Sequence, residues 1–130
     1  MNNILSELPK KISAGTITGI DDNKRGWQRF STQEAYDEFR QTHSGVSGKK
    51  MGQTRSVPLP DFDFNSNDLI IVWASRTVNI LEVKELTNEV IVIFEDEPEF
   101  ADAIAQMIFA GYYLMFSTGK SEPTKVRWQN

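Results

Sequence analysis

The chain of 130 residues has no cysteine and a single histidine, His43. Without cysteine there is no disulfide framework, no thiolate metal site and no thiol nucleophile, which fits a reducing compartment. A catalytic triad needs a histidine that is held by a third group. The nearby hydroxyls of Ser44 and Ser47 lie in a glycine-rich stretch that would not orient them. We therefore expect no catalysis at His43.

Long hydrophobic runs and an excess of positive charge are also missing. No apolar run approaches the roughly 20 residues that a membrane-spanning helix needs. The first eleven residues do not combine a basic start with an apolar core, so no signal peptide is predicted. The net charge of −4 argues against nucleic-acid binding, which depends on phosphate neutralisation. We expect a cytoplasmic protein that binds neither nucleic acid nor membrane; the alternative is an exported protein whose signal peptide is absent from this sequence.

What the chain does contain is a β-rich middle. Leu69–Ala74 is an unbroken apolar run rich in β-branched residues, which is typical of a strand covered on both faces. Val78–Leu86 alternates apolar and polar residues, but the phase slips between Ile80 and Leu81, and this slip predicts a β-bulge. Glu89–Phe94 is a further buried strand. The short link between these last two strands predicts antiparallel pairing.

The flanking sequence predicts more strands and a helix. The additional strands are expected at Ile12–Ile20, Gly26–Phe30, Tyr112–Phe116 and Thr124–Trp128. Ser31 and Glu34 have the spacing of a capping box, so a helix should run from about Thr32 to Thr42. Its buried face would hold Ala35, Tyr36 and Phe39. Gly45 stands where a glycine commonly ends a helix.

A second helix is predicted from Pro98 to Ala110. Asp96 and Glu99 repeat the capping-box pattern at its start, and Gly111 follows its end. The apolar stripe of this helix is wider than one contact requires. It is therefore either deeply buried, which is the simpler interpretation, or part of an interface.

Together these elements predict a single α+β domain over residues 1–130. It would be mainly an antiparallel sheet or a small, partly closed barrel, with one or two helices packed against it. Residues 1–10 either fray or form a short helical extension. Residues 44–60 show no periodicity and contain three glycines and two prolines. We expect them to form a long loop, of the kind that is functional or mobile.

Two acidic patterns suggest metal binding at first sight. Oxygen ligands occupy every second position at Asp61, Asp63, Asn65 and Asn67. A calcium loop also needs a glycine at its sixth position and a glutamate at its twelfth, where this chain has Ser66 and Val72. We interpret the segment as a turn leading into a strand, with Phe62 and Phe64 buried. The carboxylates from Glu95 to Asp102 fit a solvated helix start. No metal and no cofactor is expected.

Two surface features suggest contacts with other molecules. The predicted loop carries Lys49, Lys50 and Arg55 on an acidic protein, and local charge of this kind steers an acidic partner. The aromatic residues also exceed what a small core must hold: Trp27, Trp73, Trp128, Tyr112 and Tyr113. Consecutive strand residues point to opposite faces, so one of the two adjacent tyrosines should be exposed.

The order of motifs also resembles that of a known family. The relevant stretches are Gly15–Ile20, Phe30–Glu34 with Tyr36–Phe39, Pro58–Phe64, Leu69–Val72 and Tyr112–Leu114. In this order the chain resembles the C-terminal-domain family of the protease-complex accessory subunit PrcB. Where that family has a Gly-Gly-Tyr turn, this chain has Ser75–Asn79, and members are typically exported. The resemblance implies a non-enzymatic accessory or binding domain, and no functional residue carries over.

Three hypotheses follow. The first is a non-enzymatic interaction module that binds a protein partner or itself through the Gly45–Pro60 loop and exposed aromatics. The alternative is a small-molecule-binding barrel or cup with an apolar pocket, anchored by Trp73, Arg76 and Tyr112. A carboxylate hydrolase comes last, because it needs two facing carboxylates that a sequence does not show. The candidate binding residues are Lys49, Lys50, Arg55, Trp73, Arg76 and Tyr112.

Overall fold

The computed structural model describes residues 8–19, 25–47, 55–75, 78–96 and 110–130. Over these ranges the chain forms nine strands and one helix. Their bounds are β1 Lys10–Thr18, β2 Arg25–Phe30, α1 Gln33–Thr42, β3 Gly45–Ser47, β4 Arg55–Val57, β5 Asn67–Ser75, β6 Val78–Leu86, β7 Glu89–Asp96, β8 Ala110–Gly119 and β9 Lys125–Gln129. The predicted α+β fold, dominated by antiparallel sheet, is confirmed.

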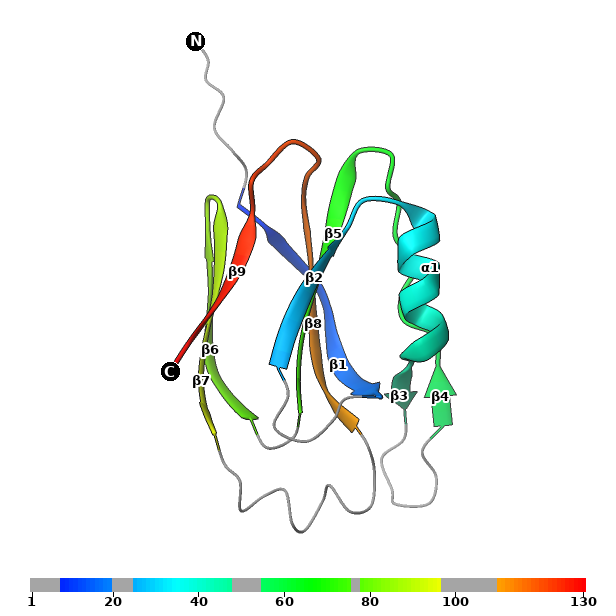
Figure 1. The fold of residues 1–130 in the computed structure, drawn as a ribbon, viewed down its shortest axis with the longest axis horizontal. Coiled ribbons are helices and arrows are strands. Elements are labelled where there is room, and N and C mark those ends of the chain that lie inside the picture. Colours follow the sequence, from blue (N-terminus) through cyan, green and yellow to red (C-terminus); the bar gives the residue numbers. More distant parts are fainter. Residues whose placement is uncertain (1–7, 20–24, 48–54, 76–77, 97–109) are drawn as a thin grey trace.

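The strands form two sheets that face each other. The larger sheet has the order β2-β5-β8-β1-β3-β4, and all its neighbours are antiparallel. The smaller sheet has the order β6-β7-β9. Figure 1 shows the smaller sheet on one side of the larger sheet and α1 on the other side. The molecule therefore has three layers, and the sheets do not close into a barrel.

Strand β5 lies in the middle layer and is buried on both faces, as its apolar run predicts. Leu69 and Ile71 point toward α1, where they pack with Tyr36 and other core residues. Ile70 and Val72 point the other way and pack against Val90, Val92 and Val126 of the smaller sheet. Because each fully buried aliphatic side chain contributes about 1.5–3 kcal/mol, this strand holds the layers together.

The β6–β7 hairpin confirms the predicted antiparallel pairing and the predicted bulge, but it does not share a sheet with β5. The strands pair antiparallel, and their register shifts between Ile80 and Glu82, where the bulge was predicted. However, β5 belongs to the larger sheet, so the three consecutive mid-chain strands are divided between two sheets. The terminal strand β9 pairs parallel with β7. This parallel pairing joins distant parts of the chain, and local sequence carries no signal for it.

Helix α1 has the predicted extent but a different cap. Its N-cap residue is Thr32, whose hydroxyl accepts a hydrogen bond from the Ala35 N–H at 3.2 Å. Ser31 does not serve as the cap, because its hydroxyl donates to the Asp68 carboxylate at 2.9 Å. The hydroxyl of Ser31, which the capping-box pattern assigns to the helix start, is instead engaged in a tertiary hydrogen bond with Asp68.

The segment predicted as a long loop contains a short hairpin. Gly45 does not end α1 as a helix-stop glycine; the C-cap is His43, and Gly45 begins β3. Strand β3 pairs with β4, and Gly45 lies between Ile17 of β1 and Val57 of β4. A Cβ at position 45 would lie 3.3 Å from a Val57 methyl carbon. Glycine at position 45 therefore allows β3 and β4 to approach closely, and it does not serve to end the helix.

Several predictions fall outside the described residues. These are the N-terminal extension up to residue 7, Lys49, Lys50, Arg76 and nearly all of the second helix, whose last predicted residue, Ala110, begins β8. In the described part of the chain, no helix has the length and apolar character needed to cross a membrane.

Candidate functional site

A buried carboxylate joins β5, β2 and the loop after β8. The Asp68 side chain is 4% exposed. It accepts hydrogen bonds from Arg29 Nε at 2.9 Å, Ser31 Oγ at 2.9 Å and Lys120 Nζ at 3.1 Å. Burial acts to raise the pKa of Asp68, but these three donors outweigh it and hold the pKa below its ordinary value. Asp68 is therefore a stable anion and a poor general base.

The remaining donors of Arg29 hold the connection between β8 and β9. Its guanidinium donates to the carbonyls of Gly119 at 2.9 Å and Glu122 at 2.6 Å. Charge-assisted bonds of this kind are stronger than neutral ones. Because its donors are directed at these protein groups, this cluster is a structural clamp, and we do not treat it as a ligand site.

A second cluster fixes the segment after β4 to α1. The Tyr36 hydroxyl donates to the Pro60 carbonyl, and burial raises the pKa of this phenol far above its ordinary value. The Arg40 guanidinium lies 4.7 Å from the centre of the Tyr36 ring and donates to Asp61 at 3.0 Å. These contacts hold the segment in place and leave Tyr36 protonated.

The segment with alternating oxygen ligands is a turn, as we interpreted it. Asp63 Oδ1 accepts a hydrogen bond from the Asn65 N–H at 2.9 Å, which is an Asx turn. Phe62 and Phe64 are half-buried against the core and contact each other with ring centres 4.7 Å apart. Both rings thus pack against the core as predicted, although they are only partly buried.

Trp73 and Tyr112 lie on opposite faces of the larger sheet. Trp73 pairs with Tyr113, and its neighbour Ala74 pairs with Tyr112. Trp73 therefore lies on the α1 face with Tyr113, which is 7% exposed, while Tyr112 lies on the other face and is 41% exposed. This confirms that one of the adjacent tyrosines is exposed. It also means that Trp73 and Tyr112 do not face a common pocket.

The feature with most potential for binding is the outer edge of β2, which we call the β2 edge. It comprises Arg25–Phe30 together with the Trp73 ring that lies against it. In the described chain β2 pairs with β5 alone, so its other edge carries backbone groups without a strand partner. The register of β2 on β5 is continuous over all six residues. Trp27, near the middle, is 36% exposed.

The two faces of the β2 edge carry different aromatic rings. Trp27 pairs with Val72 and so shares the face that looks toward the smaller sheet. On the α1 face, Gly26 pairs with Trp73. A Cβ at position 26 would lie 3.0 Å from the Trp73 ring, so glycine allows the indole to lie across the strand. Sheets often pair an edge glycine with an aromatic residue in this way.

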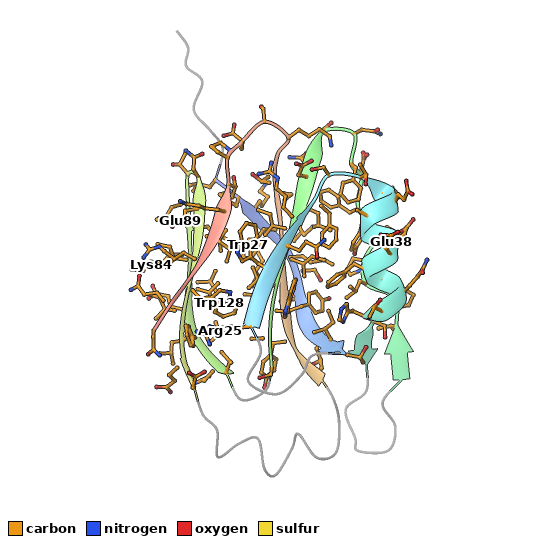
Figure 2. All side chains as sticks on the ribbon, in the orientation of Figure 1. Arg25, Trp27, Glu38, Lys84, Glu89 and Trp128 are labelled. Atoms are coloured by element: carbon orange, nitrogen blue, oxygen red, sulfur yellow. The ribbon has the colours of Figure 1, made fainter. Side chains whose placement is uncertain are left out.

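Arg25 connects the β2 edge to the smaller sheet. Its guanidinium lies 4.1 Å from the centre of the Phe94 ring and 4.0 Å from an Asp96 carboxylate oxygen. Phe94 also contacts Trp128 edge-on, with ring centres 5.6 Å apart. Figure 2 shows the positions of Arg25, Trp27 and Trp128. The open side of the sandwich next to β2 is thus lined by aromatic rings and a cation.

One small cavity lies at the other end of the sheets. It has a volume of about 190 Å³ and is lined by Leu8, Lys10, Asn67, Ser117, Thr118 and Gly119. Pockets for drug-sized ligands usually measure about 300–1,000 Å³ and are mostly apolar. This cavity is smaller and mainly polar, so it does not match the apolar cup that the alternative hypothesis requires.

The structure thus defines a three-layer α+β protein whose larger sheet ends at the regular strand β2, which has no second strand partner among the described residues. Searches of family models, curated proteins and solved structures found no match.

Sequence reasoning identified part of this site. It selected Trp73, which lies against the β2 edge, and counted Trp27 among the surplus aromatics. It did not select Arg25 or Gly26, because a strand at a sheet edge has the same local pattern as a half-covered strand within the sheet. The pairing of a glycine in one strand with a tryptophan in another is visible only once the register is known.

Proposed function

We propose that this protein is a non-enzymatic protein-binding module and that the β2 edge is its contact surface. The observation that carries this proposal is the regular outer edge of β2, which has no strand partner among the described residues and has Trp27, 36% exposed, near its middle. Tryptophan and arginine are the residue types most enriched at the energetic centres of protein interfaces. Trp27 and Arg25 supply both on one face of one strand.

The charged clusters support a binding role over catalysis. Asp68 and Arg40 direct their hydrogen bonds into the fold and hold segments in place. The resemblance to the PrcB C-terminal-domain family is consistent with such a non-enzymatic accessory role. Lys49, Lys50 and Arg55 stay predicted contacts of the basic segment, and Arg76 stays a predicted anchor of the alternative small-molecule site.

Site-specific photocrosslinking tests the proposal. A benzophenone amino acid is placed at Trp27 in one variant and at Glu38 in a matched control. Glu38 is exposed on α1, on the opposite side of the larger sheet (Figure 2). In extract from the source cells, we expect irradiation to give a defined protein adduct from position 27 and none from position 38.

Competition and size measurements complete the test. Excess unlabelled protein should abolish the adduct at position 27, because it occupies the same partner. Light scattering on the purified chain distinguishes a foreign partner from self-association, which is the other form of the first hypothesis. Equal labelling from both positions, or none from either, would contradict the proposal.

A further inference from the structure

In the described chain the two sheets end in four terminal strands, β2, β4, β6 and β9, and their outer edges differ in how they are protected. Exposed edges are commonly blocked by bulges, charges or short length. Strand β6 has a bulge and carries Glu82, Lys84 and Glu85, while β4 has only three residues. Strand β9 carries the exposed cations Lys125 and Arg127, of which Arg127 pairs with Glu89 of β7 at 2.9 Å. Only β2, among these four, is long and regular without such a device.

The charges on β2 do not block its edge, because both are turned toward the protein. Arg29 is held by Asp68 and by backbone carbonyls. Arg25 lies over the Phe94 ring. Among the described residues no strand pairs with the outer side of β2. Domains that accept an extended peptide as an added strand present an edge of this kind.

Both faces of an added strand would meet a tryptophan. On the face toward the smaller sheet, its side chains would lie beside Trp27 and Arg25. On the α1 face they would lie beside Gly26, over which the Trp73 ring extends. Cross-strand pairs of an aromatic with a β-branched residue, or of opposite charges, stabilise neighbouring strands. The Arg25 side chain is 38% exposed and its ion pair with Asp96 is long, at 4.0 Å, so a carboxylate of the added strand can share this guanidinium while an aliphatic residue pairs with Trp27.

The wider charge distribution points to the same partner. Strands β2 and β9 contain Arg25, Arg29, Lys125 and Arg127 and no carboxylate, although the whole chain has a net charge of −4. Three of these cations also pair with carboxylates of other strands: Arg25 with Asp96, Arg29 with Asp68 and Arg127 with Glu89. Strands β6 and β7 hold the acidic residues of the smaller sheet, among them Glu82, Glu85 and Glu95. An acidic segment would thus meet less like charge beside β2 than beside β6.

We propose that the β2 edge binds an extended acidic segment of a partner protein as an additional strand of the larger sheet. This inference rests on the proposed function and specifies the partner and the mode of binding. A second copy of this chain fits less well, because two β2 strands paired antiparallel about Trp27 would set Arg25 opposite Arg29 of the copy. Like charges directly opposite destabilise a strand pair.

The test uses synthetic probes and isotope-labelled protein. The probe is an end-blocked peptide of six residues, the length of β2, with the sequence Glu-Thr-Val-Thr-Glu-Thr, so that Glu and Val alternate along one face of the strand. We expect it to shift the NMR signals of β2 amides and to slow hydrogen exchange at alternate β2 residues. Replacing every Glu of the probe by Gln should weaken binding roughly tenfold, and added salt should weaken binding of the Glu probe.

Methylated probes distinguish an added strand from contact through side chains alone. N-methyl groups on alternate residues remove the hydrogen-bond donors along one edge of the peptide. Methylation of the edge that faces β2 should weaken binding roughly tenfold, whereas methylation of the other edge should have little effect. If both methylated probes bind like the parent, strand addition is excluded, and if the Gln probe binds as tightly, the acidic preference is excluded.

Protein variants locate the site. Trp27→Ser should weaken binding of the Glu–Val probe at least fivefold, and Leu81→Ser, which changes a 56% exposed residue on the bulged β6 edge, should leave it unchanged. Equal effects would overturn the assignment to β2. Binding of a single-stranded oligonucleotide in preference to the peptide, or a peptide-independent dimer lost in Trp27→Ser, would also overturn it.

The two proposals fail in different ways. If the photocrosslink at position 27 forms but no acidic probe binds, the β2 edge remains the proposed contact surface and the binding of an acidic strand is excluded. If neither occurs, the contact surface itself is wrong.

Discussion

Asp68 shows how one residue can connect several parts of this fold. Its carboxylate is almost fully buried and receives hydrogen bonds from Arg29 of β2, from Ser31 between β2 and α1, and from Lys120 after β8. Removing one partner of such a group leaves the opposing charges without compensation. The hydrogen-bond network around Asp68 therefore stabilises the fold only while all its members are present, because the loss of one leaves the others unpaired.

Asp68→Asn tests this dependence. The change keeps the size of the side chain but removes its charge, so we expect the free energy of unfolding to fall by about 2–4 kcal/mol. Urea denaturation followed by circular dichroism measures the loss. Asp63→Asn is the matched control, since that exposed side chain accepts from the Asn65 N–H and an amide oxygen keeps this bond. If both variants lose a similar amount of unfolding free energy, the buried network around Asp68 contributes no more than an exposed turn.

The same residue predicts a pH dependence. The pKa of Asp68 in the folded protein lies below its ordinary value of 3.8, because its hydrogen bonds outweigh burial. A depressed pKa stabilises the fold above the unfolded pKa, and this contribution is lost as pH falls through the folded pKa. The stability difference between wild type and Asp68→Asn should stay constant from about pH 7 to 5 and shrink below about pH 4. A difference that grows on acidification would refute the assignment.

Helix α1 illustrates the next scale, that of single elements. Its apolar residues recur at helical spacing, and Tyr36 is buried while Ala35 and Phe39 pack against the core. The extent of the helix follows from this local pattern. The identity of its cap does not, because Ser31 and Thr32 carry equivalent hydroxyls and only the position of Asp68 decides which one is free to cap.

Thr32→Ala tests the cap. Loss of the bond to the Ala35 N–H should lower the free energy of unfolding by about 1 kcal/mol. Thr32→Ser keeps the hydroxyl and should remain within about 0.5 kcal/mol of wild type in the same urea titration. An Ala variant as stable as the Ser variant would mean that the hydroxyl contributes nothing to the helix start.

Strands β3 and β4 were not predicted from the sequence, which indicated a long loop over residues 44–60. Each has three residues, too few to show an alternation. These strands form beside β1, where Gly45 of β3 pairs with Ile17. Short strands of this kind depend on a neighbour that local sequence does not specify.

At the scale of the whole molecule, β5 belongs to both cores. Its alternate residues reach the α1 layer and the smaller sheet. Removing a side chain on one face therefore weakens the support of the other face, and we expect the three layers to unfold together.

Ile70→Ala tests this coupling. Ile70 is fully buried between the sheets, so its truncation should cost about 2–5 kcal/mol. In a background where Trp27 and Trp73 are replaced by Phe, Trp128 fluorescence reports the smaller sheet and far-ultraviolet circular dichroism reports the rest. Both signals should shift to the same lower urea midpoint, and two separate midpoints would contradict a single cooperative unit.

Local sequence by itself determined that this protein is rich in β-strands, where most of them lie, and that β6 has a bulge. These features arise from the period-two alternation of neighbouring residues, which any stretch of chain carries within itself. The burial of β5 on both faces follows from its unbroken apolar run in the same way.

Only the tertiary structure decided the division into two sheets, the parallel pairing of β9 with β7, and the position of β2 at an edge. Which strands become neighbours depends on contacts between residues far apart in the chain, and alternation is the same for a strand at the edge and one half-covered within the sheet. The candidate site consists of such contacts: Trp73 lies across Gly26, and Arg25 reaches Phe94. For that reason the aromatic residues were noticed from sequence, but the edge that they surround was not.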